Sequence, residues 1–452
     1  MVGSVVLMCS FIAELSGPEF FFRLVCIIVK DRWRTGLVTC HLPAEGKAQR
    51  AKSKEQRARL RRGFGAASCA AELSKVEFCR RLGPVDSEPL LNIADYARAA
   101  RRTLSKEVFD YYEGGALDEI TLRENTAGWE KLKLYYRVLA GVAPRDMSTT
   151  VLGQPVAMPI LVAPTAFHKL ACDGGEMAAA KAAGAAKTLF VLSSLSNTAM
   201  ESVFAQAASP RWFQLYIYKD REITGELVKR AEAAGAEAIV LTVDAPGLGT
   251  RERDARNNFR LPDGLAVENL APLGKGTFPE VKGSCLAAYV RGNFKEDLGF
   301  DDLDWLCQST RLPVVVKGVC RGDDARRAAE HGAKAIVVSN HGGRQLDTAP
   351  ATSEVLPHVV DAAGDICEIY VDGGIRRGSD VLKAVAVGAR AVLVGRPILW
   401  GLCAAGEQGV VHVLEILRRE LDEAMLLCGC AKLSDIGRWL LRPSDPPSPI
   451  SG

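Results

Sequence analysis

The segment at residues 339–347 concentrates the side chains best suited to chemistry. It reads Ser-Asn-His-Gly-Gly-Arg-Gln-Leu-Asp. His341 can take up a proton near neutral pH, and Arg344 can hold a carboxylate through two parallel hydrogen bonds. The two glycines between them let the backbone turn tightly and approach a flat ligand. The combination favours removal of a proton from a small organic acid, although a His-Gly-Gly turn taken alone is more often structural.

Two further segments that contain glycine and arginine indicate an anion site. Asp-Gly-Gly-Ile-Arg occupies 372–376, and Val-Gly-Arg-Pro occupies 394–397. Backbone N–H groups in such turns and at helix N-termini bind phosphate, and Arg376 and Arg396 add charged donors. Asp372 would repel a phosphate, so we expect it to bind a sugar hydroxyl. The alternative is a pair of glycine turns that carry surface arginines.

Three more polar residues follow apolar runs. Thr242 and Asp244 are two residues apart and therefore share a face of an extended chain. We expect Asp244 to orient a histidine and raise its pKa, and Arg251 to be a second carboxylate donor. Lys317 ends the run Val-Val-Val-Lys. Since an unpaired buried charge is costly, we expect this lysine to point into a pocket.

A repeated pattern positions these residues. An alanine-rich helix end, a glycine and an apolar run recur around Gly184, Gly235, Gly332 and Gly388. Each glycine is expected to end a helix in the left-handed conformation. The runs are apolar on both faces, as parallel strands under helices are. With four further runs they predict eight strands, at 158–164, 189–193, 212–217, 237–243, 313–317, 335–339, 367–372 and 391–395. The expected fold is an α/β (β/α)8 TIM barrel with its site at the polar strand ends.

The rest of the chain divides around this barrel. We expect the barrel at 89–442, a disordered N-terminal extension at 1–88 and a disordered proline-rich tail at 443–452. Residues 46–62 hold eight Lys/Arg and one Glu, a net of +7 within a total of +3, so the remainder nets to −4. We interpret this run as a solvated arm, with a targeting segment as the alternative. Nucleic acid is therefore not an expected partner.

Metal and membrane sites are not expected either. The thirteen cysteines include no Cys-x-x-Cys pair and no zinc-type spacing, so we interpret them as free thiols in a reducing compartment. The apolar run at 5–12 is too short to span a membrane.

These motifs together resemble the FMN-dependent α-hydroxy-acid oxidases and dehydrogenases, a family that includes glycolate oxidase and L-lactate oxidase. The resemblance extends from residue 92 to residue 441. The 339–347 segment is specific to that family, whereas other FMN barrels share the segments at 372–376 and 394–397. The resemblance implies oxidation of (S)-2-hydroxy acids to 2-oxo acids, with electrons passed from FMN to O2 to give H2O2. FMN is the implied cofactor, a small 2-hydroxy acid and O2 are the implied partners, and a homo-oligomer, a tetramer, is the implied assembly.

The resemblance also implies roles for individual residues. His341 would be the catalytic base, Asp244 its partner, and Lys317 would stabilise the reduced flavin. The substrate would meet Tyr111, Tyr216, Arg251, His341 and Arg344. FMN would be bound by Pro164, Thr165, Ala166, Ser193, Gln214, Thr242, Lys317, Ser339, Asp372, Gly373, Gly374, Ile375, Arg376, Gly395 and Arg396.

One position of the implied substrate pocket departs from glycolate oxidases. By resemblance, those enzymes have Leu-Ser-Ser-Trp at the position where this chain has Leu-Ser-Ser-Leu, which ends at Leu195. The smaller side chain predicts a roomier wall and a preference for L-lactate or a longer 2-hydroxy acid over glycolate. By resemblance the enzyme is expected in peroxisomes, or else in the cytoplasm. The last three residues are Ile-Ser-Gly, not the Ser-Lys-Leu peroxisomal signal.

Two alternatives stay open. Another FMN barrel, of the isopentenyl diphosphate isomerase type, would share the phosphate segments but not the His-Gly-Gly-Arg pair. A non-catalytic barrel kept as a binding module would need none of the expected site residues, yet all of them are present.

Overall fold

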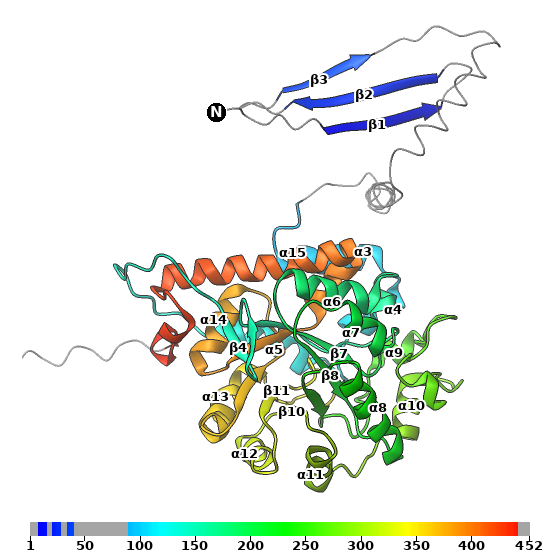
Figure 1. The fold of residues 1–452 in the computed structure, drawn as a ribbon, viewed down its shortest axis with the longest axis vertical. Helices are drawn as coiled ribbons and strands as arrows, with labels where there is room; N and C mark the ends of the chain where they lie inside the picture. Colours follow the sequence, from blue (N-terminus) through cyan, green and yellow to red (C-terminus); the bar gives the residue numbers. More distant parts are fainter. Residues whose placement is uncertain (1–7, 16–19, 29–33, 40–88, 442–452) are drawn as a thin grey trace, which may run out of the picture. The chain divides into compact units, whose positions relative to one another are not determined.

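The computed structural model describes residues 8–15, 20–28, 34–39 and 89–441 (Figure 1). The chain falls into two compact units, Met1–Val85 and Asp86–Gly452. In the first unit, β1 (Met8–Leu15), β2 (Phe20–Ile28) and β3 (Arg34–Thr39) form an antiparallel sheet in the order β1-β2-β3. The sequence analysis expected no strands there. The basic run at 46–62 and the tail at 443–452 lie outside the described residues, and the three-part division of the chain stays a prediction.

The second unit is a closed barrel of eight parallel strands, which confirms the (β/α)8 fold. Around the barrel the strands follow the order β10-β11-β12-β13-β6-β7-β8-β9, and β9 pairs with β10 to close it. Each strand falls on one of the eight predicted runs, to within two residues at every end. The strands are β6 (Ile160–Val162), β7 (Phe190–Ser193), β8 (Arg211–Leu215), β9 (Ile239–Thr242), β10 (Val314–Val319), β11 (Ala335–Val338), β12 (Glu368–Val371) and β13 (Ala391–Val394).

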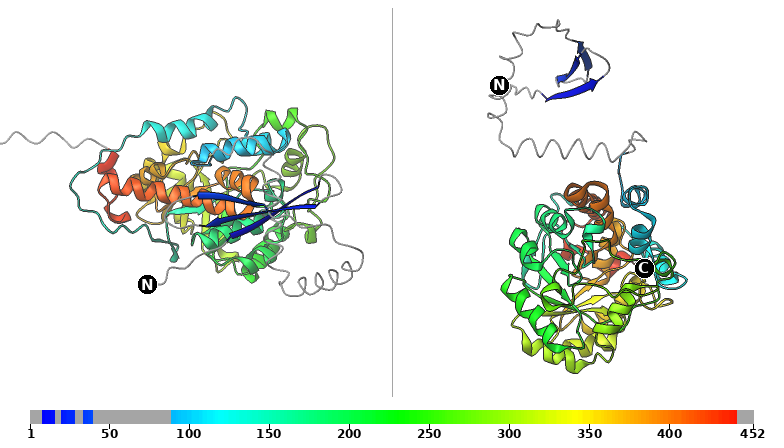
Figure 2. Two further views of the ribbon diagram at one scale, coloured as in Figure 1. Left: turned by 90° about the horizontal axis from the view of Figure 1, so that it is seen from above. Right: turned by 90° about the vertical axis from the view of Figure 1, so that its right-hand side faces the viewer.

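Helices alternate with these strands and surround them (Figure 2). The chain enters the barrel through three helices and a short hairpin, β4 (Thr149–Val151) and β5 (Gln154–Val156). The helices are α3 (Ile93–Thr103), α4 (Lys106–Glu113), α5 (Ile120–Lys131), α6 (Gly175–Ala185), α7 (Met200–Gln206), α8 (Arg221–Ala233), α9 (Glu252–Arg256), α10 (Cys285–Asn293), α11 (Phe300–Ser309), α12 (Gly322–Glu330), α13 (Thr352–Ala363), α14 (Gly378–Val387) and α15 (Arg396–Cys428).

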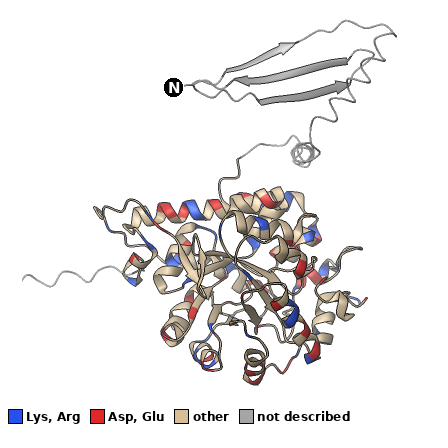
Figure 3. Cartoon of the chain, viewed as in Figure 1, with Lys and Arg blue, Asp and Glu red and all other residues tan. Residues whose placement is uncertain are grey.

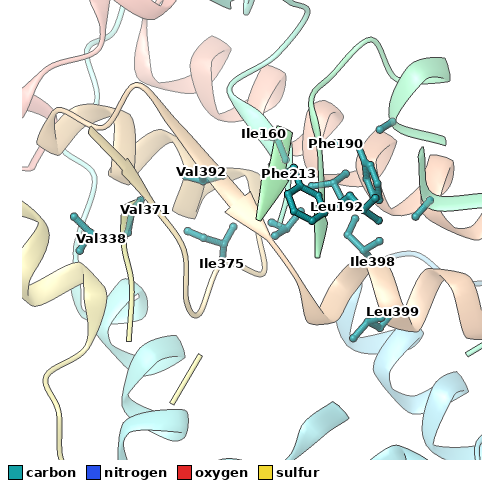
Figure 4. Close-up of a cluster of buried hydrophobic side chains, with 14 of the residues drawn as sticks. Ile160, Phe190, Leu192, Phe213, Val338, Val371, Ile375, Val392, Ile398 and Leu399 are labelled. Carbon is teal, nitrogen blue, oxygen red and sulfur yellow. The ribbon is translucent and has the colours of Figure 1, made fainter. Parts of the chain in front are cut away.

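The strands are buried on both faces, as their uniformly apolar sequences predict. Side chains that point inward, such as Trp212 and Tyr370, fill the barrel together with Val151 and Val156 of the hairpin. Side chains that point outward pack against the helices, and Figure 4 shows a part of this outer layer around Phe213. Because the barrel interior is a packed apolar core, a ligand has access only at its ends.

Three of the four predicted helix-ending glycines have positive φ, at +88°, +98° and +127° for Gly235, Gly332 and Gly388. The prediction for Gly184 was wrong, because α6 continues through this residue and the positive φ falls on Lys187, at +53°. Gly184 instead lies close to Ala208, where an added Cβ would come within 3.3 Å of a methyl group. At this position the glycine serves close packing.

Parallel register brings the polar ends of neighbouring strands side by side. Ser193 pairs with Gln214, and Thr242 pairs with Lys317. On the outer surface, basic and acidic residues are interspersed along the helices in the view of Figure 3. Within the described part of the chain, no helix is long and apolar enough to cross a membrane.

Candidate active site

A pocket opens at the carboxyl ends of the barrel strands. It holds about 1180 Å³ of empty space, a volume that includes open solvent at its mouth. All of the residues predicted to bind cofactor or substrate line it, except Ser339. Ser339 and Asp244 lie directly behind the wall, where each bonds to a residue that does line the pocket.

His341 is held in a strained loop three residues after β11. Its φ is +58°, a conformation that non-glycine residues rarely adopt. Its backbone N–H donates to Ser339 Oγ at 3.1 Å, and its ring Nδ1 lies 2.8 Å from Asp244 Oδ1. Since an ionised carboxylate can only accept, Nδ1 carries the hydrogen in this bond. Nε2 is therefore left as the proton acceptor of the ring.

The position of Asp244 depends on a glycine of the adjacent strand. β10 has an irregular register between Lys317 and Val319, and Gly318 at this point has a φ of +108°. A Cβ on Gly318 would lie 2.6 Å from the Cβ of Asp244. Gln345 fixes the same loop, because its Nε2 donates to the Asp244 carbonyl oxygen at 2.8 Å. Glycine and glutamine thus bring Asp244 to the histidine.

The two partners shift each other's pKa against the effect of burial. Burial alone would raise the pKa of Asp244, but the charges of His341 and Lys317 outweigh it and lower that pKa. Burial lowers the pKa of His341, and the opposing influence of Asp244 does not restore it. We had expected Asp244 to raise the pKa of the histidine. It does act in that direction, but desolvation dominates, so the ring is neutral at physiological pH.

Lys317 points to the pocket, as predicted, and it is paired. Its Nζ lies 3.2 Å from Asp372 Oδ2 and donates to Ser339 Oγ at 3.0 Å. Burial would lower the pKa of this lysine, but Asp372 and Asp244 raise it, so the cation is retained. Asp372, which we had expected to bind only a sugar hydroxyl, is therefore an ion-pair partner. Its other oxygen, Oδ1, is buried without a partner among the described residues and is free to accept from a ligand.

A chain of hydrogen bonds runs along the ends of three neighbouring strands. Ser193 Oγ donates to Gln214 Oε1 at 3.2 Å, and Gln214 Nε2 donates to Thr242 Oγ1 at 3.0 Å. All three side chains are almost fully buried. The bond to Ser193 and the bond to Thr242 fix which end of the Gln214 amide faces which neighbour, so the wall presents an ordered set of donors and acceptors.

Two arginines share the mouth of the pocket with Tyr111. Arg251 is 8% exposed, and its Nε is buried without a partner among the described residues. Burial, and then the nearby charge of Arg344, lower the pKa of Arg251 to about 10. Arg344 donates from one nitrogen to the carbonyls of Tyr111 and Gly114 at 2.7 and 2.8 Å. One buried and one half-buried guanidinium so close together favour an anion between them.

The loops after β12 and β13 form another part of the pocket wall. Gly374 has a φ of +79°, and a Cβ there would collide with the Asn125 carbonyl oxygen, so the loop packs tightly onto α5. The Arg376 N–H donates to Asp380 Oδ2 at 3.1 Å. Arg396 donates to the carbonyls of Tyr112, Gly342 and Gly114 at 3.0, 3.0 and 3.1 Å. Both arginines line the pocket, and Arg396 uses three of its five N–H donors on backbone carbonyls.

Several residues in the pocket wall or packed directly behind it were not predicted from the sequence. Phe259 stacks on Tyr111 with ring centroids 4.2 Å apart, and Phe294 stacks on Tyr216 at 4.5 Å. Further lining side chains come from the β9–α9 loop and α10: Leu248, Leu286 and Val290. The spacing 286, 290 and 294 is that of one helical face, but such a face reads as ordinary core. In the described residues, no cluster of metal-ligating side chains occurs.

Comparison with known proteins assigns the chain to a family. The FMN-dependent dehydrogenase family matches residues 100–443. The L-lactate oxidase of Nostoc sp. is 51% identical, with 76% of this chain and 96% of that protein covered. Human 2-hydroxyacid oxidase 1 is 48% identical over 78% of this chain and 96% of its own length. A crystal structure of mandelate oxidase with (S)-4-hydroxymandelic acid superimposes with a TM-score of 0.74 at 41% identity, covering 76% of this chain and 97% of that one. The protein belongs to the FMN-dependent dehydrogenase family and is an FMN-dependent oxidoreductase.

Proposed function

We propose that the protein oxidises (S)-2-hydroxy acids to 2-oxo acids and passes the electrons through FMN to O2, giving H2O2. The observation that carries this proposal is the meeting of a carboxylate-paired histidine and two arginines, Arg251 and Arg344, in one pocket. A base and a carboxylate clamp are the two groups that this reaction needs from the protein.

The unsatisfied polar groups of the pocket fit FMN. Bound FMN supplies the two-electron acceptor that the side chains of the chain lack. Asp372 Oδ1 would accept from a ribityl hydroxyl, and Gln214 would bond the edge of the ring. Lys317 would place its positive charge beside the bound ring. The phosphate would lie against the loops at 372–376 and 395–396, close to the N-terminus of α15.

The remaining residues act on the substrate. Arg251 and Arg344 hold its carboxylate, and Tyr111 and Tyr216 border the same space. His341 Nε2 removes a proton from the substrate, and Asp244 stabilises the positive charge that the ring then carries. The hydrogen bond from Nδ1 to Asp244 keeps the ring in the tautomer that this step requires.

The preferred substrate carries a methyl or longer α-substituent. Leu195 is 6% exposed and lines the pocket together with Leu248 and Leu286, so this part of the wall is apolar. An apolar wall without a bulky indole suits L-lactate or a longer chain. Both relatives named above as oxidases of lactate and 2-hydroxy acids support this class.

The test uses purified holoenzyme with L-lactate, D-lactate, glycolate and 2-hydroxyoctanoate. We expect FMN to be released on heating, and O2 uptake to be matched by peroxide with L-lactate but not with D-lactate. Reduction of a dye without O2 uptake would contradict O2 as the acceptor. Cofactor release without turnover of any hydroxy acid would contradict the substrate class.

We also propose a homo-oligomer, a tetramer, located in peroxisomes or the cytoplasm. Large apolar side chains are exposed after α5 and at the end of α15, at Tyr136, Val138, Leu139 and Leu427, and such patches mark interaction surfaces. Light scattering gives the assembly. Imaging of the full-length chain gives the compartment.

A further inference from the structure

A buried histidine that the proposed mechanism does not use lies behind the pocket wall. His168 is 1% exposed and does not line the pocket. Its ring Nε2 lies 2.5 Å from Thr165 Oγ1, and its Nδ1 is buried without a partner among the described residues. Thr165 does line the pocket, three residues after the end of β6. The His168–Thr165 hydrogen bond therefore connects the buried interior with the part of the pocket wall that would face the cofactor.

The surroundings of His168 determine its charge. Burial lowers its pKa, against the opposing influence of Glu176 and of a hydrogen bond with the Thr165 backbone. The Glu176 carboxylate is itself fully used, because it accepts from the N–H groups of His168 and Asn197 at 3.1 and 2.9 Å and from Thr198 Oγ1 at 2.9 Å. The imidazole is therefore neutral and carries one hydrogen.

The unpartnered Nδ1 identifies which nitrogen carries that hydrogen. A hydrogen on Nδ1 would be a buried donor without an acceptor. This costs more free energy than a buried acceptor lone pair that receives no hydrogen bond. The hydrogen is therefore on Nε2, and His168 donates to Thr165 Oγ1. The hydroxyl of Thr165 then cannot donate to His168, so its own hydrogen points elsewhere.

The rest of the threonine side chain is fixed too. A Cβ on Gly395 would lie 3.2 Å from Thr165 Cγ2, so the methyl group packs against that glycine. No other bond of Thr165 Oγ1 occurs in the described part of the chain beyond the one to His168. The remaining direction for the hydroxyl hydrogen is the pocket.

We propose that His168 is a positioning residue: by donating from Nε2 to Thr165 Oγ1, it directs the Thr165 hydroxyl into the pocket as a donor to an acceptor atom of bound FMN. The inference rests on the proposed placement of FMN against Thr165. A donor fixed in advance loses less entropy on binding than one that must first be oriented. His168 would thus contribute to FMN affinity without contacting FMN.

The experiment compares two nearly isosteric replacements of His168. Gln retains a donor, whereas Met fills similar space without one. We expect His168→Met to raise the dissociation constant of FMN for the apoprotein about five- to tenfold, the size of one hydrogen bond, and His168→Gln to leave it within about twofold. Fluorescence quenching of added FMN measures the constant without any substrate.

The variant Thr165→Val tests the placement of FMN against Thr165 separately from the role of His168. If Thr165→Val alone leaves FMN affinity unchanged, FMN does not lie against Thr165 and the placement fails. If Thr165→Val weakens FMN binding, His168→Met should add nothing further in that background. An additive loss would mean that His168 acts on the fold and not on the hydroxyl, and would overturn the inference.

The tautomer can be read directly in the unaltered protein. The chain has six histidines, and comparison of ¹⁵N-histidine-labelled wild type with His168→Gln assigns the signals of this ring. We expect a protonated Nε2 and a bare Nδ1. A protonated Nδ1 would overturn the inference even if the Met variant does not fold.

Discussion

Two arginines that line the pocket make different use of the same functional group. Burial lowers the pKa of both, to about 10 for Arg251 and about 9 for Arg396. Arg396 nevertheless donates three hydrogen bonds to backbone carbonyls, from α4, the loop after it and the loop after β11. Arg251 leaves its Nε without a partner in the described structure.

The contrast indicates which side is built for a ligand that comes and goes. A buried guanidinium with unused donors is costly in the free protein, and the cost is offset only when an anion binds. A guanidinium that donates to three carbonyls instead ties separate segments together even when no ligand is bound. We therefore call His341, Asp244 and Arg251 the reactive side of the pocket, and Arg396 with the carbonyls that it bonds the scaffold side.

The largest expected effect tests the reactive side. His341→Gln removes the proton acceptor but keeps a side chain of similar polarity, so FMN should still bind. Flavin reduction by L-lactate under anaerobic conditions should slow by roughly 10²–10⁴-fold, the usual contribution of a positioned base. Stopped-flow absorbance measures this rate. Reduction at a near-normal rate would show that another group takes the proton.

A matched pair of substitutions tests the contrast itself. Arg251→Met should lower kcat/KM by about 10–100-fold, since a hydrogen bond to a charged group is worth roughly 1.5–3 kcal/mol, with little change in thermal stability. Arg396→Met should destabilise the fold by about 1–3 kcal/mol, because it removes three hydrogen bonds and leaves the Gly342 carbonyl without its donor. Calorimetry measures the thermal stability of both variants, and steady-state kinetics measures their kcat/KM. If Arg251→Met is the more destabilising of the two, the division into reactive side and scaffold is wrong.

The contacts of Arg396 show which features of the site could not be predicted from the sequence. The eight strands could be predicted because parallel strands under helices must be apolar on both faces, and the polar ends of those strands then had to meet at one rim. That Arg396 would bond to Tyr112 and Gly114 could not be predicted, because these contacts join segments almost three hundred residues apart in the chain. Motif spacing carries no information on such tertiary contacts.

The same limit holds for the aromatic side chains. Tyr111 was expected in the site through resemblance, whereas its stacking partner Phe259 was not. A phenylalanine in a polar loop has no period that marks it as buried. The Lys317–Asp372 pair was also missed, since each residue was considered at the end of its own strand and the register between strands was not known.

A substitution in the apolar wall sharpens the description of the reactive side. Leu195→Trp should shift preference from L-lactate and 2-hydroxyoctanoate toward glycolate by roughly 1–3 kcal/mol, because the indole fills the space beside the α-substituent. Comparison of kcat/KM for the three acids on wild type and variant measures the shift. A wild-type enzyme that already favours glycolate tenfold would show that another wall residue sets the pocket.

The smallest effect concerns the pH dependence of the reactive side. His341 acts as a base only when Nε2 is unprotonated, and burial lowers its pKa from the usual value of about 6.5. A plot of the flavin-reduction rate against pH should therefore show the rate retained as pH falls to 6.5 and lost only below that pH. Asp244 raises the pKa of His341, so Asp244→Asn should move the midpoint to still lower pH while slowing the plateau rate. Leu195→Trp carries no charge change and should leave the midpoint in place. A midpoint above pH 7 in the wild type, or an upward shift in Asp244→Asn, would mean that the acidic limb reports a group other than His341.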